Sequence, residues 1–155
     1  MPYEAETLII GCGNLLFKDD GFGPFVIQAL EKHFENKEMP ESTMFIDAGT
    51  AAPYYIFSLP EEIWKKIIVV DIIMFGAEPG TLRFFTPDEI PETKYQDAHA
   101  PIDSGSLKEL VDLGIEVKIL GCQPKEISSP DVDMGLTEPV EEAVPKAVEL
   151  ILKNI

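Results

Sequence analysis

The sequence predicts an α/β fold in which helices cover both faces of a β-sheet. Short apolar runs alternate along the chain with segments whose apolar residues recur at helical spacing. The length of 155 residues lies within the size range of one domain. Because no linker, repeat or low-complexity stretch interrupts the pattern, we expect a single domain over residues 1–155.

Five apolar segments have the length and composition of strands. The first stops at Gly11, and the third is the strongest β-branched run of the chain and ends directly at Asp71. The predicted strands cover residues 7–11, 43–46, 67–70, 81–85 and 116–120.

Helices are predicted between these strands and after the last one. From Phe22, apolar residues recur at helical spacing as far as Phe34, and Pro24 lies in the first turn, where a missing N–H costs little. Thr137 is predicted to cap a C-terminal helix. Further helices are expected over 54–59 and 104–113, another turn over 61–64, and a polar functional loop over 86–101.

The composition excludes several classes of partner. A formal net charge of −16, from 28 acidic and 12 basic residues, repels phosphate backbones, so nucleic acid is not expected. No stretch approaches the roughly 20 apolar residues of a membrane helix, and no membrane partner is expected. The acidic start of the chain lacks the basic region of a secretory signal, which favours a cytoplasmic protein.

Polar residues follow three of the predicted strands. Asn14 and the pair Asp19 and Asp20 follow the first strand, Asp47 follows the second, and Asp71 ends the third. Sites in such sheets form just beyond the carboxyl ends of the strands. A carboxylate that ends a β-branched run is hard to desolvate without a partner, so Asp71 is a candidate residue of the functional site. A helix or turn cap is the alternative for Asp71.

His99 can join these carboxylates from the long polar loop. Two carboxylates and one imidazole make a site for a borderline divalent metal such as nickel or zinc, with positions left open. The alternative is a solvated histidine without a function. The other histidine, His33, lies near the end of the first predicted helix, where it favours the helix dipole.

Other chemistries fit the sequence less well. The segment from Gly11 begins like a dinucleotide fingerprint, but Leu16 occupies the position of the third glycine. Cys12 is either a nucleophile near His99 or a small buried thiol, and the buried thiol is favoured because free cysteine is commonly buried. The two cysteines are too few for a disulfide framework or a zinc knuckle.

Five sequence blocks together resemble the hydrogenase maturation proteases. They occur in the order GCGNLLFKDDGFG at 11–23, DAGT at 47–50, IVVD at 68–71, GCQP at 121–124 and MGLTEPV at 134–140. The cysteine after Gly11 and the long loop are similar to small archaeal members tied to deazaflavin-reducing hydrogenases.

The resemblance implies a twisted five-stranded sheet sandwiched between helices, with metal-contacting residues at Asp20, Asp71 and His99. It also implies an endopeptidase of the aspartic type. Such an enzyme would recognise nickel in the precursor large subunit of a nickel-iron hydrogenase and remove its C-terminal extension. The nickel would come from the precursor and would not be held permanently by the protease.

We expect Asp20 or Asp71 to act as the base for an attacking water. Asn14, Asp47 and Thr50 are expected to hold the substrate, and the loop glycines to let it approach closely. Two alternatives remain open at this stage. One is a nickel-sensing maturation chaperone that binds the precursor without cutting it, and the other is a nucleotide-binding α/β enzyme.

Overall fold

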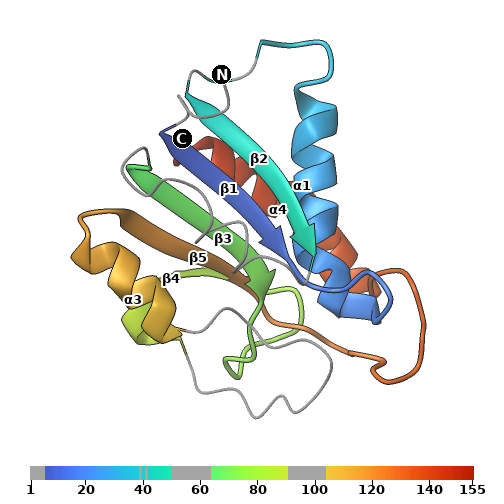
Figure 1. Cartoon of the computed structure of the whole chain (residues 1–155). Helices are drawn as coiled ribbons and strands as arrows, with labels where there is room; N and C mark the ends of the chain where they lie inside the picture. The colour runs from blue at the N-terminus through green and yellow to red at the C-terminus, as the bar shows by residue number, and fades with distance from the viewer. Residues whose placement is uncertain (1–5, 39, 41, 50–63, 91–103) are drawn as a thin grey trace.

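The computed structural model describes residues 6–38, 40, 42–49, 64–90 and 104–155. These residues form one five-stranded sheet with helices on both faces, which confirms the predicted fold class (Figure 1). The strands are β1 (Thr7–Cys12), β2 (Thr43–Gly49), β3 (Lys66–Ile72), β4 (Leu82–Phe85) and β5 (Glu116–Cys122). The helices are α1 (Phe22–His33), α3 (Ser104–Asp112) and α4 (Glu138–Leu152), with short 3-10 helices η2 (Lys18–Gly21) and η4 (Pro87–Glu89).

The strand order is β2-β1-β3-β5-β4. β1 pairs in parallel with β2 and β3, and β3 pairs in parallel with β5. The four parallel strands therefore have their carboxyl ends at one edge of the sheet. β4 pairs antiparallel with β5, so its own carboxyl end lies at the opposite edge.

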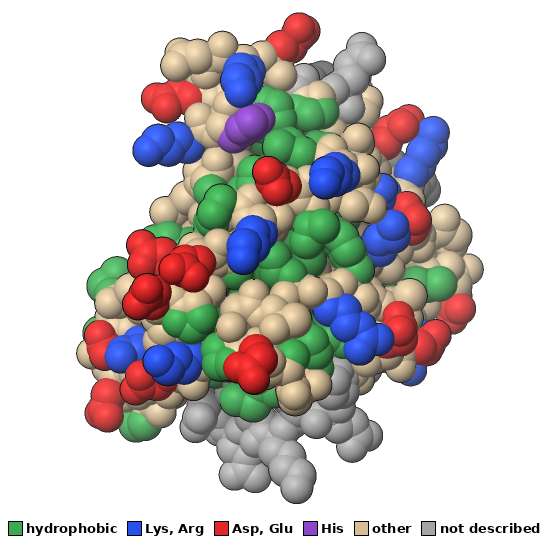
Figure 2. Space-filling model, turned by 180° about the vertical axis from the view of Figure 1, so that it is seen from behind, with side chains coloured by type: hydrophobic (Ala, Val, Ile, Leu, Met, Phe, Trp, Pro, Cys, Tyr) green, Lys and Arg blue, Asp and Glu red, His purple; other side chains and the backbone are tan. Residues whose placement is uncertain are grey.

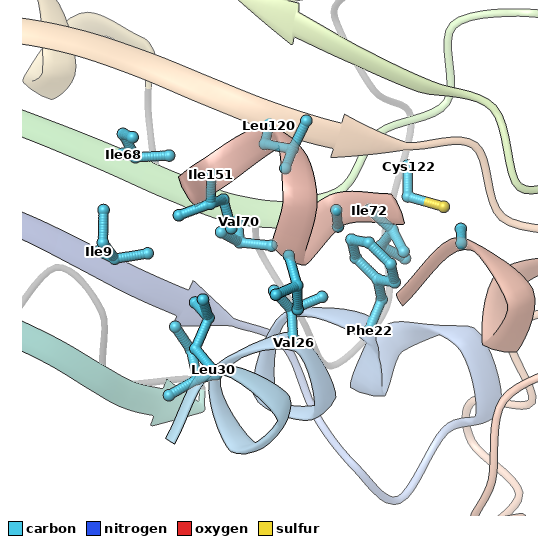
Figure 3. Packing of buried hydrophobic residues seen from close by; sticks show 14 of the residues in the cluster. Ile9, Phe22, Val26, Leu30, Ile68, Val70, Ile72, Leu120, Cys122 and Ile151 are labelled. Atoms are coloured by element: carbon cyan, nitrogen blue, oxygen red, sulfur yellow. The ribbon is translucent and has the colours of Figure 1, made fainter. Parts of the chain in front are cut away.

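Alternate residues of the central strands enter two separate cores. Ile9 and Ile68 pack in the core that contains α1 and α4 (Figure 3). Leu8 and Ile67 pack in the other core, together with Leu107 of α3. Because side chains alternate between the faces of a strand, burial on both faces produces the continuous apolar runs seen in the sequence.

Two glycines let α1 approach the sheet closely. A Cβ atom on Gly23, in the first turn of α1, would lie 2.2 Å from the carbonyl oxygen of Cys12 and 2.5 Å from that of Val70. A Cβ atom on Gly11 would lie 2.6 Å from the carbonyl oxygen of Gly23. The start of α1 thus lies directly on β1 and β3, which places η2 just beyond the ends of these strands.

Thr137 occupies the N-cap position of α4, but its side chain makes no capping hydrogen bond. Its hydroxyl donates to the carboxylate of Asp19 at 2.8 Å, a charge-assisted hydrogen bond. The predicted helix at 54–59, residues 61–63 of the turn predicted over 61–64 and residues 91–101 of the loop predicted over 86–101 lie outside the described residues. The start of that loop contains the 3-10 helix η4. None of the described helices is long and apolar enough to span a membrane.

Candidate active site

Three neighbouring strands bring two carboxylates to the same edge of the sheet as Cys12. In the parallel register, Gly11 of β1 lies opposite Asp47 of β2 and Val70 of β3. Cys12 and Asp71 are the next residues along their strands. Asp71 is buried inside β3, whereas Asp47 is exposed near the end of β2.

The structure does not support the alternative in which Asp71 serves only as a helix or turn cap. It lies within β3, paired with Gly121 of β5, and does not begin a helix. One carboxylate oxygen, Oδ1, accepts a hydrogen bond from the backbone N–H of Ile72 at 2.8 Å. A buried carboxylate in a parallel strand is rare, which supports a role beyond folding for Asp71.

Asp20 reaches the same edge from η2. It is buried, and its Oδ2 accepts a hydrogen bond from the backbone N–H of Asn14 at 3.2 Å. The loop folds tightly because Gly13 has a φ of +135°, and a Cβ atom there would lie 1.9 Å from the carbonyl oxygen of Asp20. The Oδ1 atom of Asn14 accepts the N–H of Leu16 at 2.9 Å, so this side chain also shapes the loop.

The pKa of Cys12 shows how these carboxylates converge. Burial raises the pKa of the Cys12 thiol well above its ordinary value, and the charges of Asp71, Asp20 and Asp47 raise it further. The three carboxylates therefore act on one point although they come from three separate elements. A thiol with a raised pKa stays protonated and is a poor nucleophile, which favours the interpretation of Cys12 as a buried thiol.

Asp19 has a structural role that the sequence reasoning missed. Its buried carboxylate accepts the backbone N–H groups of Lys125 at 2.8 Å and Glu126 at 2.9 Å. It also accepts the backbone N–H and the hydroxyl of Thr137, both at 2.8 Å. Asp19 thereby ties both ends of the segment between β5 and α4 to η2. No local pattern in the sequence indicates this role, because the partners of Asp19 lie 106 to 118 positions away.

The sequence and fold of this chain are similar to those of hydrogenase maturation proteases. The family model described as hydrogenase maturation protease matches residues 24–154. The chain is 57% identical over 155 residues to the coenzyme F420 hydrogenase subunit delta of Methanothermobacter thermautotrophicus, covering 100% of this chain and 98% of that protein. It is 48% identical over 154 residues to a putative hydrogenase maturation protease of Methanocaldococcus jannaschii, covering 98% and 97% of the two chains.

The chain belongs to the hydrogenase maturation protease family. It is therefore an endopeptidase. The crystal structure of a [NiFe] hydrogenase maturation protease from Thermococcus kodakarensis has the same fold, with a TM-score of 0.74 at 22% identity over 96% of this chain and 91% of that chain. The nucleotide-binding alternative finds no support in these relatives.

The structure describes only some of the predicted site residues. His99 and Thr50 lie outside the described residues. Within the ranges that the structure describes, no group of three or more histidine, cysteine, aspartate or glutamate side chains is arranged to hold a metal ion. The two buried carboxylates are suitable oxygen donors for a borderline metal, and a third ligand would have to come from elsewhere.

The loop glycines of the protease have a different role from the one expected. The close contacts of Gly13 are to the backbone of Asp20, and a Cβ atom on Gly21 would lie 3.2 Å from the Cα atom of Leu15. These glycines pack the loop against the protein itself. Gly49 at the end of β2 is more open, because a Cβ atom there meets only the carbonyl oxygen of Gly13, at 3.7 Å.

Proposed function

We propose that this protease removes a C-terminal extension from the precursor large subunit of a nickel-iron hydrogenase, and that it recognises nickel already present in the precursor. The observation that carries the proposal is the convergence of Asp20 and Asp71, both buried, at the edge of the sheet beside Cys12. We further propose that the hydrogenase is one that uses the deazaflavin coenzyme F420. The 57% identity to a protein named coenzyme F420 hydrogenase subunit delta supports this choice.

The nickel ion enters as part of the substrate. In this proposal Asp20, Asp71 and His99 contact the ion held by the precursor, and their carboxylate and imidazole donors suit it. A precursor without nickel would lack this anchor and would not be positioned for cleavage. The ion can also polarise the scissile carbonyl.

The two carboxylates supply the base of an aspartic-type mechanism. Asp20 or Asp71 takes a proton from a water molecule as the water oxygen attacks the carbonyl carbon of the scissile peptide bond. The carbon–nitrogen bond then breaks, and the departing amine receives a proton from the same carboxylic acid. The shortened subunit ends in a new carboxylate, and the released extension begins with a new amine. Water is the only other reactant.

Asn14, Asp47 and Thr50 are proposed to hold the substrate backbone around the scissile bond. The exposed position of Asp47 near the end of β2 supports its part in this proposal, since a peptide can reach it from solvent. The substrate would be met in the cytoplasm, where the hydrogenase precursor is assembled in this proposal.

Cleavage by site variants tests the proposal. In Asp20→Asn and Asp71→Asn the amide cannot act as a base, so we expect the rate of cleavage of a nickel-loaded precursor to fall at least about 100-fold. In His99→Gln the imidazole that is proposed to contact the ion is lost, so we expect a similar fall in the rate of cleavage. Asp112→Asn, which changes an exposed carboxylate at the end of α3, is the matched control and should cleave normally.

The same assay separates the protease from the chaperone alternative. A chaperone would form a stable complex with the loaded precursor and give no shortened product. Normal cleavage by all three site variants would refute the residue assignment, even if the wild-type protein is active.

A further inference from the structure

Three exposed apolar side chains lie on two neighbouring segments at the edge of the sheet where the parallel strands end. Leu16 lies in the loop between β1 and η2, and Val132 and Met134 lie in the segment between β5 and α4. Backbone hydrogen bonds join the two segments. The N–H of Asp133 donates to the carbonyl oxygen of Leu16 at 2.8 Å, and the N–H of Lys18 donates to that of Asp133 at 2.8 Å. We call the side chains of Leu16, Val132 and Met134 the apolar platform.

The platform is exposed although it stands on a well-anchored part of the fold. The exposed fractions are 40% for Leu16, 66% for Val132 and 63% for Met134. Single exposed apolar residues are common, but a group of them marks an interaction site. The carboxylate of Asp19 binds the backbone at both ends of the 125–137 segment, so the platform is presented by an ordered surface.

The platform continues into a groove between α1 and α4. Gly135 and Leu136, which follow Met134 in the chain, line this groove together with Phe25 and Val144. The groove has a volume of about 450 Å³. Figure 2 shows the molecule from behind, with hydrophobic side chains on this side interspersed with charged ones. Gln28, Lys32 and Glu141 also line the groove, so its apolar floor has a polar and charged rim.

The charges around the platform are predominantly negative. Outside the buried pair Asp19 and Asp20, segments 14–20 and 125–138 carry the lysines Lys18 and Lys125 and four exposed carboxylates, namely Glu126, Asp131, Asp133 and Glu138. Lys18 is already paired with Glu126 at 3.1 Å and with Asp133 at 3.2 Å. A partner that complements this surface would therefore carry apolar side chains flanked by lysine or arginine.

We propose that the apolar platform and its groove are a docking surface for the hydrogenase precursor, and that they bind an apolar, basic segment outside the extension that is removed. The inference rests on the proposed function, because it assigns the precursor as the partner. The loop that carries Leu16 also carries Asn14 and leads into Asp20, so one precursor molecule can contact the platform and the active site together. Three side chains are too few for a stable complex alone, so docking adds affinity to contacts at the active site.

The test measures binding and cleavage of the nickel-loaded precursor by the double variant Val132→Ser/Met134→Ser. Both positions are exposed, so we expect the fold to be kept. The dissociation constant, measured in the Asp71→Asn background so that the complex is not consumed, should rise about tenfold. With Asp71 intact, KM should rise about tenfold and kcat should change less than about twofold. Unchanged values of the dissociation constant and KM would overturn the proposal.

Leu113→Ser is the matched control, because Leu113 is 60% exposed but follows α3, away from the platform. It should change neither binding nor cleavage. Asp131→Lys tests the charge part of the proposal and alters no apolar residue. It should weaken binding at low ionic strength and have little effect at high ionic strength. An equal loss of binding in Leu113→Ser would contradict a surface specific to the platform.

Failure of the proposed function and failure of the docking surface give different results. If the wild-type protein never shortens the precursor but the double variant binds it about tenfold more weakly, the cleavage proposal fails and the docking surface stands. If the platform instead joins two copies of this chain, the double variant loses self-association in sedimentation while its affinity for the precursor is unchanged. That result overturns the docking proposal.

Discussion

The carboxylate of Asp19 accepts both the backbone N–H and the hydroxyl of Thr137 at 2.8 Å. These residues are 118 positions apart in the chain, so the contact joins the first connection of the sheet to the start of the last helix. Asp20, the next residue, faces the candidate active site. The anchoring residue Asp19 and the proposed site residue Asp20 are thus adjacent, and a change at Asp19 should reach Asp20 through the backbone of η2.

Asp19→Asn tests this link. The amide group of asparagine replaces one acceptor oxygen by a donor, which leaves backbone N–H groups of the 125–137 segment without their acceptor. We expect the free energy of unfolding to fall by about 3 kcal/mol, because buried hydrogen bonds to a charged acceptor are lost. Chemical denaturation measures this value. Asp112→Asn is the control, and an equal stability of the two variants would contradict the anchoring role of Asp19.

Thr137→Val separates the hydroxyl contact from the backbone contact. Valine keeps the shape of threonine but loses the hydroxyl donor to Asp19. We expect a loss of about 1–2 kcal/mol in the free energy of unfolding. Thr137→Ser keeps the hydroxyl donor, so its free energy of unfolding should fall less than that of Thr137→Val. If both variants are equally unstable, the lost methyl or the helix start, and not the hydrogen bond, determines the effect.

Gly23→Ala tests the close packing of α1 on the sheet. The added methyl would lie 2.2 Å from the carbonyl oxygen of Cys12 and 2.5 Å from that of Val70, so helix and strands must separate. We expect destabilisation by more than about 3 kcal/mol and loss of cleavage activity, because η2 would move with the helix. Gly135→Ala is the control, since its φ of +106° adds backbone strain but no atom of the described residues lies within 4 Å of the added Cβ. Its free energy of unfolding should fall by only about 1–2 kcal/mol.

Local patterns predicted most of the fold. The runs in β1 and β3 are nearly all apolar because both faces of these strands are buried, and α1 begins at the predicted residue. The antiparallel direction of β4 was not predicted, because an apolar run has the same composition in either direction. Direction is decided by the connections and by pairing with β5, which are not local properties of 81–85.

The positions of Asp71 and Asp47 were predictable because each directly follows a predicted strand. The structure extends β3 to Ile72 and β2 to Gly49, so both residues lie inside strands, and the parallel register sets their positions. The role of Asp19 was not predictable in the same way. Its partners lie more than 100 residues away, in a segment with no regular pattern. Thr137 shows the same limit, because only the folded chain brings the carboxylate of Asp19 within hydrogen-bond distance of its hydroxyl.

The stability of the protein should depend on the Cys122 thiol at alkaline pH. Burial and the charge of Asp19 raise the pKa of Cys122 to about 12. In the unfolded chain the thiol has a pKa of about 8.5, so above this pH the native state binds more protons than the unfolded state. The free energy of unfolding attributable to Cys122 should therefore be fully present below about pH 8.5 and fall as the pH rises towards about 12.

Comparison with Cys122→Ala isolates this effect from other groups that titrate in the same range. Between about pH 9 and about pH 11, the unfolding free energy of the wild type should fall more steeply than that of the variant, by up to about 1.4 kcal/mol per pH unit. Urea denaturation at several pH values gives both slopes. Parallel slopes would show that the thiol is not shielded as the structure indicates.

Nickel-dependent cleavage is tested most directly by the intact mass of the precursor large subunit after incubation with this protein, with and without nickel loaded. We expect only the loaded precursor to lose the mass of its C-terminal extension. We expect Asp71→Asn to abolish this loss and Asp112→Asn to keep it. An unchanged mass of the loaded precursor, with the complex still formed, would contradict cleavage and favour a chaperone. Shortening that is equally fast without nickel would contradict nickel recognition.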